Sequence, residues 1–212
     1  MRSHVGHPVP LPSLTDQARR LLDLGVHDLA GTTPDALLDA AGRVGPDGLL
    51  VTAAPASALA PLLRLGDKEG FVVEDMTDVD GFRPTDVAAV PAAPYVVARI
   101  DRGDAHLDRT PAETLPDLLA AGRSPLTVEE GLHWVLQDPD VLERNHCFMT
   151  IGSRLRKPDG AYDARTPALW ISNGTGRDGK ERRGAPKLGW CWWGNRHTWL
   201  GIASCGSRTA LA

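Results

Sequence analysis

The chain has 212 residues, enough to bury a hydrophobic core as one large domain or two small ones. No apolar run follows Met1, and no stretch approaches the length of a membrane helix, so we expect neither a signal peptide nor a membrane partner. The three cysteines have no close pairing, which is typical of reduced thiols. These features predict a soluble cytoplasmic protein.

The net charge of −4 is distributed unevenly along the chain. Residues 1–149 carry 12 Lys and Arg against 23 Asp and Glu, a net charge of −11, whereas residues 150–212 carry 11 against 4, a net charge of +7. Two interpretations stay open. The halves pack together and neutralise each other, or the C-terminal part presents a surface that binds anions.

The chain begins with a Pro- and His-rich stretch, residues 1–12, which we expect to be disordered. Residues 13–212 are expected to form one domain, with a possible sub-boundary near 74–93. Ser13 is a helix cap before an apolar stripe that predicts a helix over 14–24, and Thr33-Pro34 opens a second helix over 35–41.

Short strands and helices should alternate in the middle of the chain. Residues 49–53, 71–73 and 95–100 have strand composition, and a helix is expected over 57–65. The acidic and then Pro- and Ala-rich residues 74–93 are typical of a long loop. Asp101-Arg102-Gly103-Asp104 after the third strand is interpreted as a charged turn rather than a catalytic site.

Two more helices are expected, one from Thr110 to Ala121 and one after Thr127, ending at Asp138-Pro139. Thr127 and Glu130 have the spacing of a capping box, so we assign Glu129 and Glu130 to the start of the helix rather than to acid–base chemistry.

The C-terminal part reads as four strands over 147–151, 168–172, 187–193 and 197–204. Consecutive short strands favour an antiparallel meander, with the charged, Gly-rich residues 174–184 as a mobile loop. The expected fold class is therefore α+β, with N-terminal helices packed on a mainly antiparallel sheet.

Four of the six tryptophans lie within residues 186–205, together with two cysteines and one histidine. Gly194-Asn195 predicts a tight turn, so the last two strands should pair as a Trp-rich hairpin. In that register one face carries Leu188, Trp190, Trp192, His197 and Trp199. The other face carries Lys187, Cys191, Trp193, Arg196 and Thr198. A thiol–imidazole dyad of Cys191 and His197 is disfavoured, because the two side chains project to opposite faces.

No phosphate-binding loop, dinucleotide fingerprint, nucleophile-elbow serine or paired-cysteine motif occurs. The spacing of Cys147, Cys191 and Cys205 relative to His146 and His197 is not diagnostic of zinc, so no metal site or cofactor is assigned.

Several segments resemble a family of uncharacterised proteins from actinomycete-type bacteria that is known only as a domain of unknown function. They are residues 124–131, Cys147-Phe148, Gly152-Ser153-Arg154, residues 167–172, residues 185–192 and residues 197–201. The Asp101-Arg102-Gly103 turn also fits the family. The resemblance covers most of residues 95–205 and implies no reaction. The chain departs from the family pattern in a longer loop at 174–184, which bears on access to the hairpin.

The leading functional hypothesis is the binding of a small anionic or aromatic ligand at the Trp-rich sheet. Trp170, Trp190 and Trp192 would supply stacking surfaces, His197 and Asn195 would orient the ligand, and Arg154 or Lys187 would pair with its charge. One alternative is a hydrolase or transferase that uses Cys191, Cys147 or His197. Another is a partner-binding or single-stranded nucleic-acid module, disfavoured in its nucleic-acid form by the acidic net charge.

Overall fold

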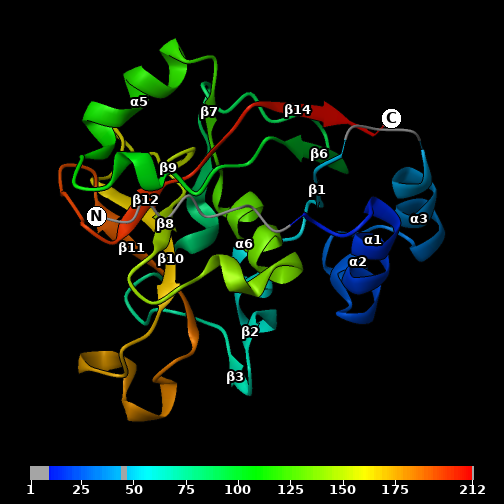
Figure 1. Ribbon diagram of the computed structural model, residues 1–212, viewed down its shortest axis with the longest axis horizontal. Coiled ribbons are helices and arrows are strands. Elements are labelled where there is room, and N and C mark those ends of the chain that lie inside the picture. The colour runs from blue at the N-terminus through cyan, green and yellow to red at the C-terminus, as the bar shows by residue number, and fades with distance from the viewer. Residues whose placement is uncertain (1–9, 44–46, 212) are drawn as a thin grey trace.

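The N-terminal helices gather at one end of the molecule in the computed structural model, which describes residues 10–43 and 47–211 (Figure 1). They are α1 (Leu14–Asp23), α2 (Val26–Leu29) and α3 (Pro34–Gly42). Ser13 and Thr33 cap α1 and α3 as the sequence predicts, each accepting a bond from the backbone three residues on. Residues 1–9 of the expected disordered tail lie outside the described residues.

The largest sheet has five strands in the order β12-β8-β10-β11-β4. Their bounds are β4 (Phe71–Val72), β8 (Cys147–Met149), β10 (Arg165–Ile171), β11 (Pro186–Trp192) and β12 (Leu200–Ile202). The three central strands, β8, β10 and β11, pair antiparallel, which confirms the predicted meander as far as residue 192. The two outer strands, β4 and β12, pair parallel to their neighbours.

A second sheet is antiparallel and has the order β1-β6-β14, formed by β1 (Leu49–Val51), β6 (Tyr95–Ala98) and β14 (Ser207–Ala210). Three smaller pairs join distant parts of the chain or form local turns. They are β2 (Arg64–Leu65) with β3 (Lys68–Glu69), β5 (Phe82–Pro84) with β9 (Ser153–Leu155), and β7 (Ser124–Pro125) with β13 (Ser204–Cys205). The mixture of helices and mainly antiparallel sheets confirms the α+β class.

Helices α4 (Ala56–Leu59), α5 (Pro111–Ala120) and α6 (Val128–Gln137) complete the α-helical elements described. Short 3-10 turns lie at 60–62, 79–81, 104–106, 139–141, 176–178 and 180–182. The helix expected over 57–65 is shorter, because Pro61 converts its second half into the 3-10 turn that ends at Leu62. The expected long loop over 74–93 contains β5, which pairs with β9.

The predicted C-terminal hairpin is wrong. Asn195 N–H does close a turn onto the carbonyl of Trp192, but the chain does not return along β11. One edge of β11 pairs with β10 over its whole length, and the other pairs with β4 at Lys187 and Leu188. Residues 193–199 cross to the other edge of the sheet, where Leu200–Ile202 pairs parallel to β8.

Helix α6 packs between the two sheets, against β1 on one side and β10 on the other (Figure 1). A Cβ at Gly131 would lie within 3.1 Å of Thr150, Leu169 and Phe148 side-chain atoms, so only glycine permits this close approach. The predicted capping box of Thr127 and Glu130 is present.

Glu130 also accepts bonds from outside its helix, and with them it holds the C-terminal strand. Arg208 of β14 donates to both carboxylate oxygens, at 2.5 Å and 2.8 Å, and Tyr95 Oη donates at 3.0 Å. Arg208 is 4 % exposed and Glu130 is fully buried. The guanidinium of Arg208 further donates to Ser124 Oγ and to the carbonyls of Ala88 and Pro125. A buried charge pair is stable only when its remaining polar atoms are bonded in this way.

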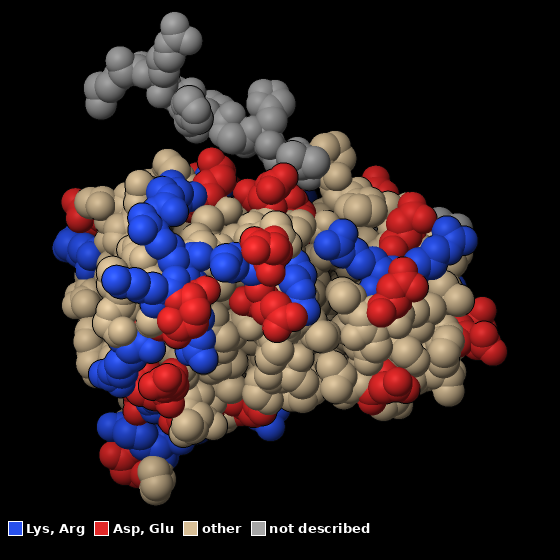
Figure 2. All heavy atoms as spheres, turned by 90° about the horizontal axis from the view of Figure 1, so that it is seen from below, with Lys and Arg blue, Asp and Glu red and all other residues tan. Residues whose placement is uncertain are grey.

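Ion pairs between the two halves of the chain account for much of the charge asymmetry. They are Arg165–Asp78, Arg177–Asp75, Arg196–Glu113 and Arg208–Glu130. Each joins a basic residue after position 150 to an acidic residue before it. On the face shown in Figure 2, basic and acidic side chains are accordingly interleaved. The first interpretation of the asymmetry, mutual neutralisation, is supported.

Among the described residues, no helix is long and apolar enough to cross a membrane.

The Glu130–Arg208 pair should dominate the stability of the fold. We expect Arg208→Met to lower the free energy of unfolding by about 3–5 kcal/mol, because it leaves a buried carboxylate without its counter-ion. The double variant Glu130→Gln/Arg208→Met should lose less than the sum of the single changes in urea denaturation. Arg19→Met, which breaks an exposed pair with Asp16, is the control and should leave the free energy of unfolding nearly unchanged. Additive effects at 130 and 208 would contradict the coupling.

His133 on α6 should make the fold sensitive to acid. Its Nδ1 bonds the carbonyl of Glu129 and its Nε2 accepts from the backbone of Thr52, while burial lowers its pKa to about 4. A lowered pKa means that the unfolded chain binds the proton first, so stability is complete above about pH 6.5 and is lost as the pH falls towards 4. We expect a loss on the order of 3 kcal/mol between these limits, measured by urea denaturation. His133→Gln should show a shallower pH dependence, and an unchanged dependence would contradict this role.

Candidate functional site

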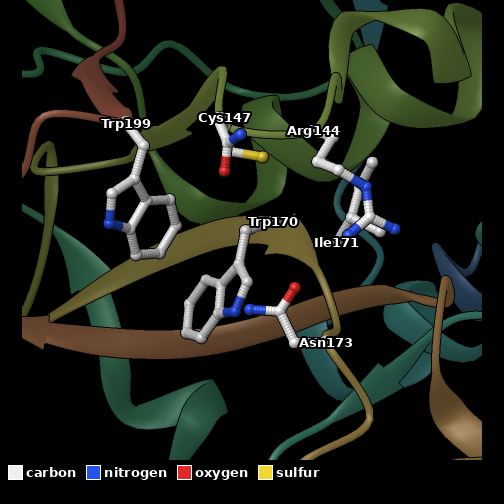
Figure 3. A pocket seen from close by; sticks show the side chains of 7 residues that line it. Arg144, Cys147, Trp170, Ile171, Asn173 and Trp199 are labelled. Atoms are coloured by element: carbon white, nitrogen blue, oxygen red, sulfur yellow. The ribbon is translucent and has the colours of Figure 1, made fainter.

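A cavity of about 170 Å³ opens on the face of the five-stranded sheet that points away from α6. Its lining comes from three segments far apart in sequence: Arg144, Asn145 and Cys147; Trp170, Ile171 and Asn173; and Trp199. In Figure 3 the two indoles stand on one side of the cavity, Arg144 stands on the other, and Cys147 lies between them. The arrangement combines two flat aromatic walls with polar groups at the mouth.

The face on which the cavity lies follows from strand register. Phe148 pairs with Leu169 on the face that packs on α6, and Met149 pairs with Ala168 on the opposite face. Because side chains alternate along a strand, Cys147 and Trp170 share the face of Ala168. On β11 the same face carries Lys187, which lies opposite Trp170.

Trp170 is held in one position by its neighbours. Its ring lies on the backbone of Gly189, where a Cβ would come within 2.5 Å of Trp170 Cη2. The ammonium group of Lys187 lies 4.8 Å from the ring centroid and is itself anchored at 2.7 Å by Asp178, with both charged groups largely buried. A cation over an indole face is attracted by the ring quadrupole. This wall of the cavity is therefore preorganised.

The second wall, Trp199, reaches the site because residues 193–199 cross the sheet. Its ring meets Trp170 edge to face at 6.2 Å between centroids, and His197 meets Trp199 in the same manner at 5.4 Å. The carbonyls of His197 and Trp199 accept bonds from Asp108 and Cys147, which fix the crossing segment. His197 thus packs against Trp199, and burial lowers the pKa of His197.

The mouth of the cavity is formed by a tight turn. Glu143 and His146 exchange both backbone hydrogen bonds, at 3.1 Å and 3.0 Å, so Arg144 and Asn145 occupy the tip. Asn145 has φ of 66°, a left-handed conformation that asparagine tolerates better than most residues. The Cys147 thiol donates to the Glu143 carbonyl at 3.3 Å, which ties the turn to the sheet.

Several polar groups of the site are without partners in the described part of the chain. The guanidinium of Arg144, the side-chain amides of Asn145 and Asn173, and the indole N–H groups of Trp170 and Trp199 make no hydrogen bond to any described residue. Both tryptophans are half-buried, and their N–H groups are not among the buried atoms that lack a partner, so water can reach them. The site therefore offers hydrogen-bond donors that a bound molecule could satisfy.

The three thiols are poor nucleophiles. Burial raises the pKa of Cys147 and of Cys205 to about 11, and that of Cys191 to about 12. The thiolate, not the thiol, is the reactive form. No hydrogen bond joins Cys191 to His197 among the described residues, so the hydrogen-bonded dyad disfavoured by the sequence is not formed, although the hairpin used in that argument is wrong.

In the described ranges, no three His, Cys, Asp or Glu side chains gather closely enough to hold a metal ion.

The structure separates the site residues predicted from the sequence. Trp170 lines the cavity. Lys187 lies over the ring of Trp170, and His197 packs edge to face against Trp199. Trp190 and Trp192 project from the other face of β11, where their rings meet at 4.6 Å and Trp192 is 46 % exposed. Trp190 donates to Asp75.

Arg154 and Asn195 also lie outside the cavity. Arg154 is sandwiched between the rings of Trp193, at 3.9 Å, and Tyr162, at 5.0 Å, and donates to the carbonyl of Asp163. Asn195 is exposed in the crossing segment. The hairpin error explains the misplacement of Asn195, which was assigned to the turn of the hairpin.

Arg144, Asn145 and Asn173 are functional candidates that sequence reasoning missed. They lie in turns without a motif, and only the paired backbone bonds of residues 143 and 146 bring Arg144 and Asn145 over the sheet. The signal in the sequence was weak: an asparagine directly before a strand, which marks a turn but not its position in space.

A second hollow, of about 210 Å³, lies on the other side of Lys187. Three cationic side chains of its lining, Arg177, Arg182 and Lys187, are matched by three carboxylates, those of Glu74, Asp75 and Asp178. Asp75 pairs with Arg177 and Asp178 pairs with Lys187. This hollow carries no net charge that would attract an anion.

The sequence profile of DUF5701, a family of unknown function, matches residues 20–211, so the chain belongs to that family. No curated protein matches the chain, and no solved structure matches it.

Thiol reactivity tests the electrostatics of the site. At pH 7.5 we expect Cys147, Cys191 and Cys205 to react with iodoacetamide roughly 100-fold more slowly than free cysteine, because their raised pKa values leave little thiolate. All three should react fast in urea, which serves as the control. A native thiol that reacts at the rate of free cysteine would revive a nucleophilic role for that residue.

Proposed function

We propose that this member of a family of unknown function binds a small organic molecule in the cavity between Trp170 and Trp199. The observation that carries the proposal is the pairing of two positioned indoles with donors that lack protein partners. Ligand pockets place a few polar groups beside aromatic and aliphatic walls, and this cavity sets the polar side chains of Arg144, Asn145 and Asn173 beside its two indoles.

The size of the cavity restricts the ligand. An apolar cavity of about 150 Å³ takes up one benzene molecule. The cavity here, at about 170 Å³, has room for a single ring with a small substituent. Nucleotides and other drug-sized ligands occupy pockets of about 300 Å³ or more and would extend out of it.

The enzyme alternative receives less support from the site. Cys147 is buried and Cys191 half-buried, the pKa values of both thiols are raised, and the His197 Nε2 atom is buried without a partner in the described residues. A nucleophile needs a base within hydrogen-bond reach, and no described residue supplies one to Cys147 or Cys191.

The nucleic-acid alternative also receives less support. Base stacking needs a free aromatic face beside cations. Arg154 covers a face of Trp193, and Arg154 and Arg156 both lie against Tyr162. Four of the eleven basic residues of the C-terminal part are paired with acidic residues from the other half.

Calorimetric titration with single-ring probes tests the proposal. Benzoate, benzamide, phenol and phenethylamine would each be titrated into the protein. We expect at least one to bind with one-to-one stoichiometry, and Trp170→Leu and Trp199→Leu each to weaken it by about 10-fold, since each removes an aromatic wall.

Trp192→Leu is the matched control, because Trp192 lies on the opposite face of the sheet and should leave binding unchanged. Circular dichroism would establish that each variant is folded. Undiminished binding to a folded Trp170→Leu protein would contradict the proposal, as would the failure of every probe to bind.

A further inference from the structure

We infer that the cavity selects a single-ring carboxylate, with Arg144 as the residue that pairs with the carboxylate group. The inference rests on the proposed function and adds the charge and polarity of the ligand. The inference follows from the distribution of charged side chains around the cavity and does not use the cavity volume.

Arg144 is a solvent-exposed cation at the tip of the turn, and no described residue pairs with it. The adjacent acid, Glu143, is engaged by Arg102, whose Nη1 donates to it at 2.7 Å. Arg144 itself makes no ion pair or hydrogen bond with any described residue. A guanidinium presents donors in a planar fork that matches a carboxylate in a two-bond arrangement.

The lining of the cavity contains no carboxylate that could compete for Arg144. Asp178, behind Trp170, is already bonded by Lys187 at 2.7 Å and by the Ser172 hydroxyl at 2.8 Å. The lining residues therefore carry one positive charge and no negative charge. An anion that entered would be attracted by Arg144 and would meet no acidic side chain within the lining.

The same charges disfavour a cationic ligand. The aromatic face that would attract an ammonium group, that of Trp170, already has the Lys187 ammonium 4.8 Å from its centroid. A second cation beside Lys187 and Arg144 would be repelled by both. A ring that carries an ammonium group is thus disfavoured by the feature that holds the indole in position.

A ligand can place its ring and its carboxylate in the cavity together, because the two indoles and Arg144 line opposite sides of it. Figure 3 shows Trp170 and Trp199 on the side opposite Arg144. A ring packed against the indoles would direct its carboxylate to the turn at Arg144 and Asn145. The Asn145 and Asn173 amides supply further donors at the mouth, and the bonded Glu143–His146 turn fixes the backbone position from which Arg144 extends.

Titration of isosteric probes into charge variants tests the inference. Benzoate and benzamide have nearly the same shape and differ in charge. We expect benzoate to bind the unchanged protein at least 10-fold more tightly than benzamide, and phenethylamine not to bind. Arg144→Gln should weaken benzoate by about 10-fold or more, the loss expected from one charge-assisted hydrogen bond, and should leave benzamide unchanged. Arg144→Lys should retain part of the preference.

Arg20→Gln, an exposed change on α1 with the same effect on net charge, is the control and should leave all affinities unchanged. Equal affinity for benzoate and benzamide, unaltered by Arg144→Gln, would overturn the inference and leave ring binding intact. Displacement of benzoate by chloride or sulfate, with no affinity for any neutral ring, would also overturn it by showing a site for simple anions. If no probe binds at all, the proposed function itself is contradicted. That outcome differs from ring binding without charge selectivity, which contradicts only the present inference.

Discussion

The buried pair of Glu130 and Arg208 is the constraint on which the arrangement of the two sheets depends. It joins the start of α6 to the last strand, and Tyr95 on the neighbouring strand completes it. Two charges removed from water require that each remaining polar atom be bonded, and here the partners come from β6, β7, α6 and β14. The polar network thus specifies how helix and sheet meet, where apolar packing alone would allow sliding.

With α6 held in that position, the two faces of the five-stranded sheet become different. The face with Phe148 and Leu169 is filled by the helix, whose Gly131 permits the contact. On the opposite face, the turn at Arg144 and Asn145 and the side chains of Asn173 and Trp199 lie around Cys147 and Trp170. Loose closure of one face leaves a cavity, which explains why the candidate site lies there and not in the Trp190–Trp192 cluster.

The path of residues 193–199 has the largest effect on the site. The alternation of side chains along β11 was predicted correctly, whereas the turn lies one residue earlier than predicted, with Trp193 and Gly194 at its centre. The partner of the next strand was misassigned, because sequence neighbours are usually but not always sheet neighbours. The strand 200–202 instead pairs with β8, where Gly201 allows contact with the backbone of Arg102 and Gly103, and this change brings Trp199 to Trp170.

The sequence by itself determined the local features: the caps at Ser13, Thr33 and Thr127, the α+β class, and the strands β8, β10 and β11 with their alternating faces. These depend on interactions within a few residues, which composition and spacing record. Only the tertiary structure decided the partner of β12, the pairing of acidic and basic halves, and the placement of Arg144, Trp170 and Trp199 around one cavity. Those contacts join residues far apart in the chain, and the competition among strand edges that selects them leaves no mark in the local sequence.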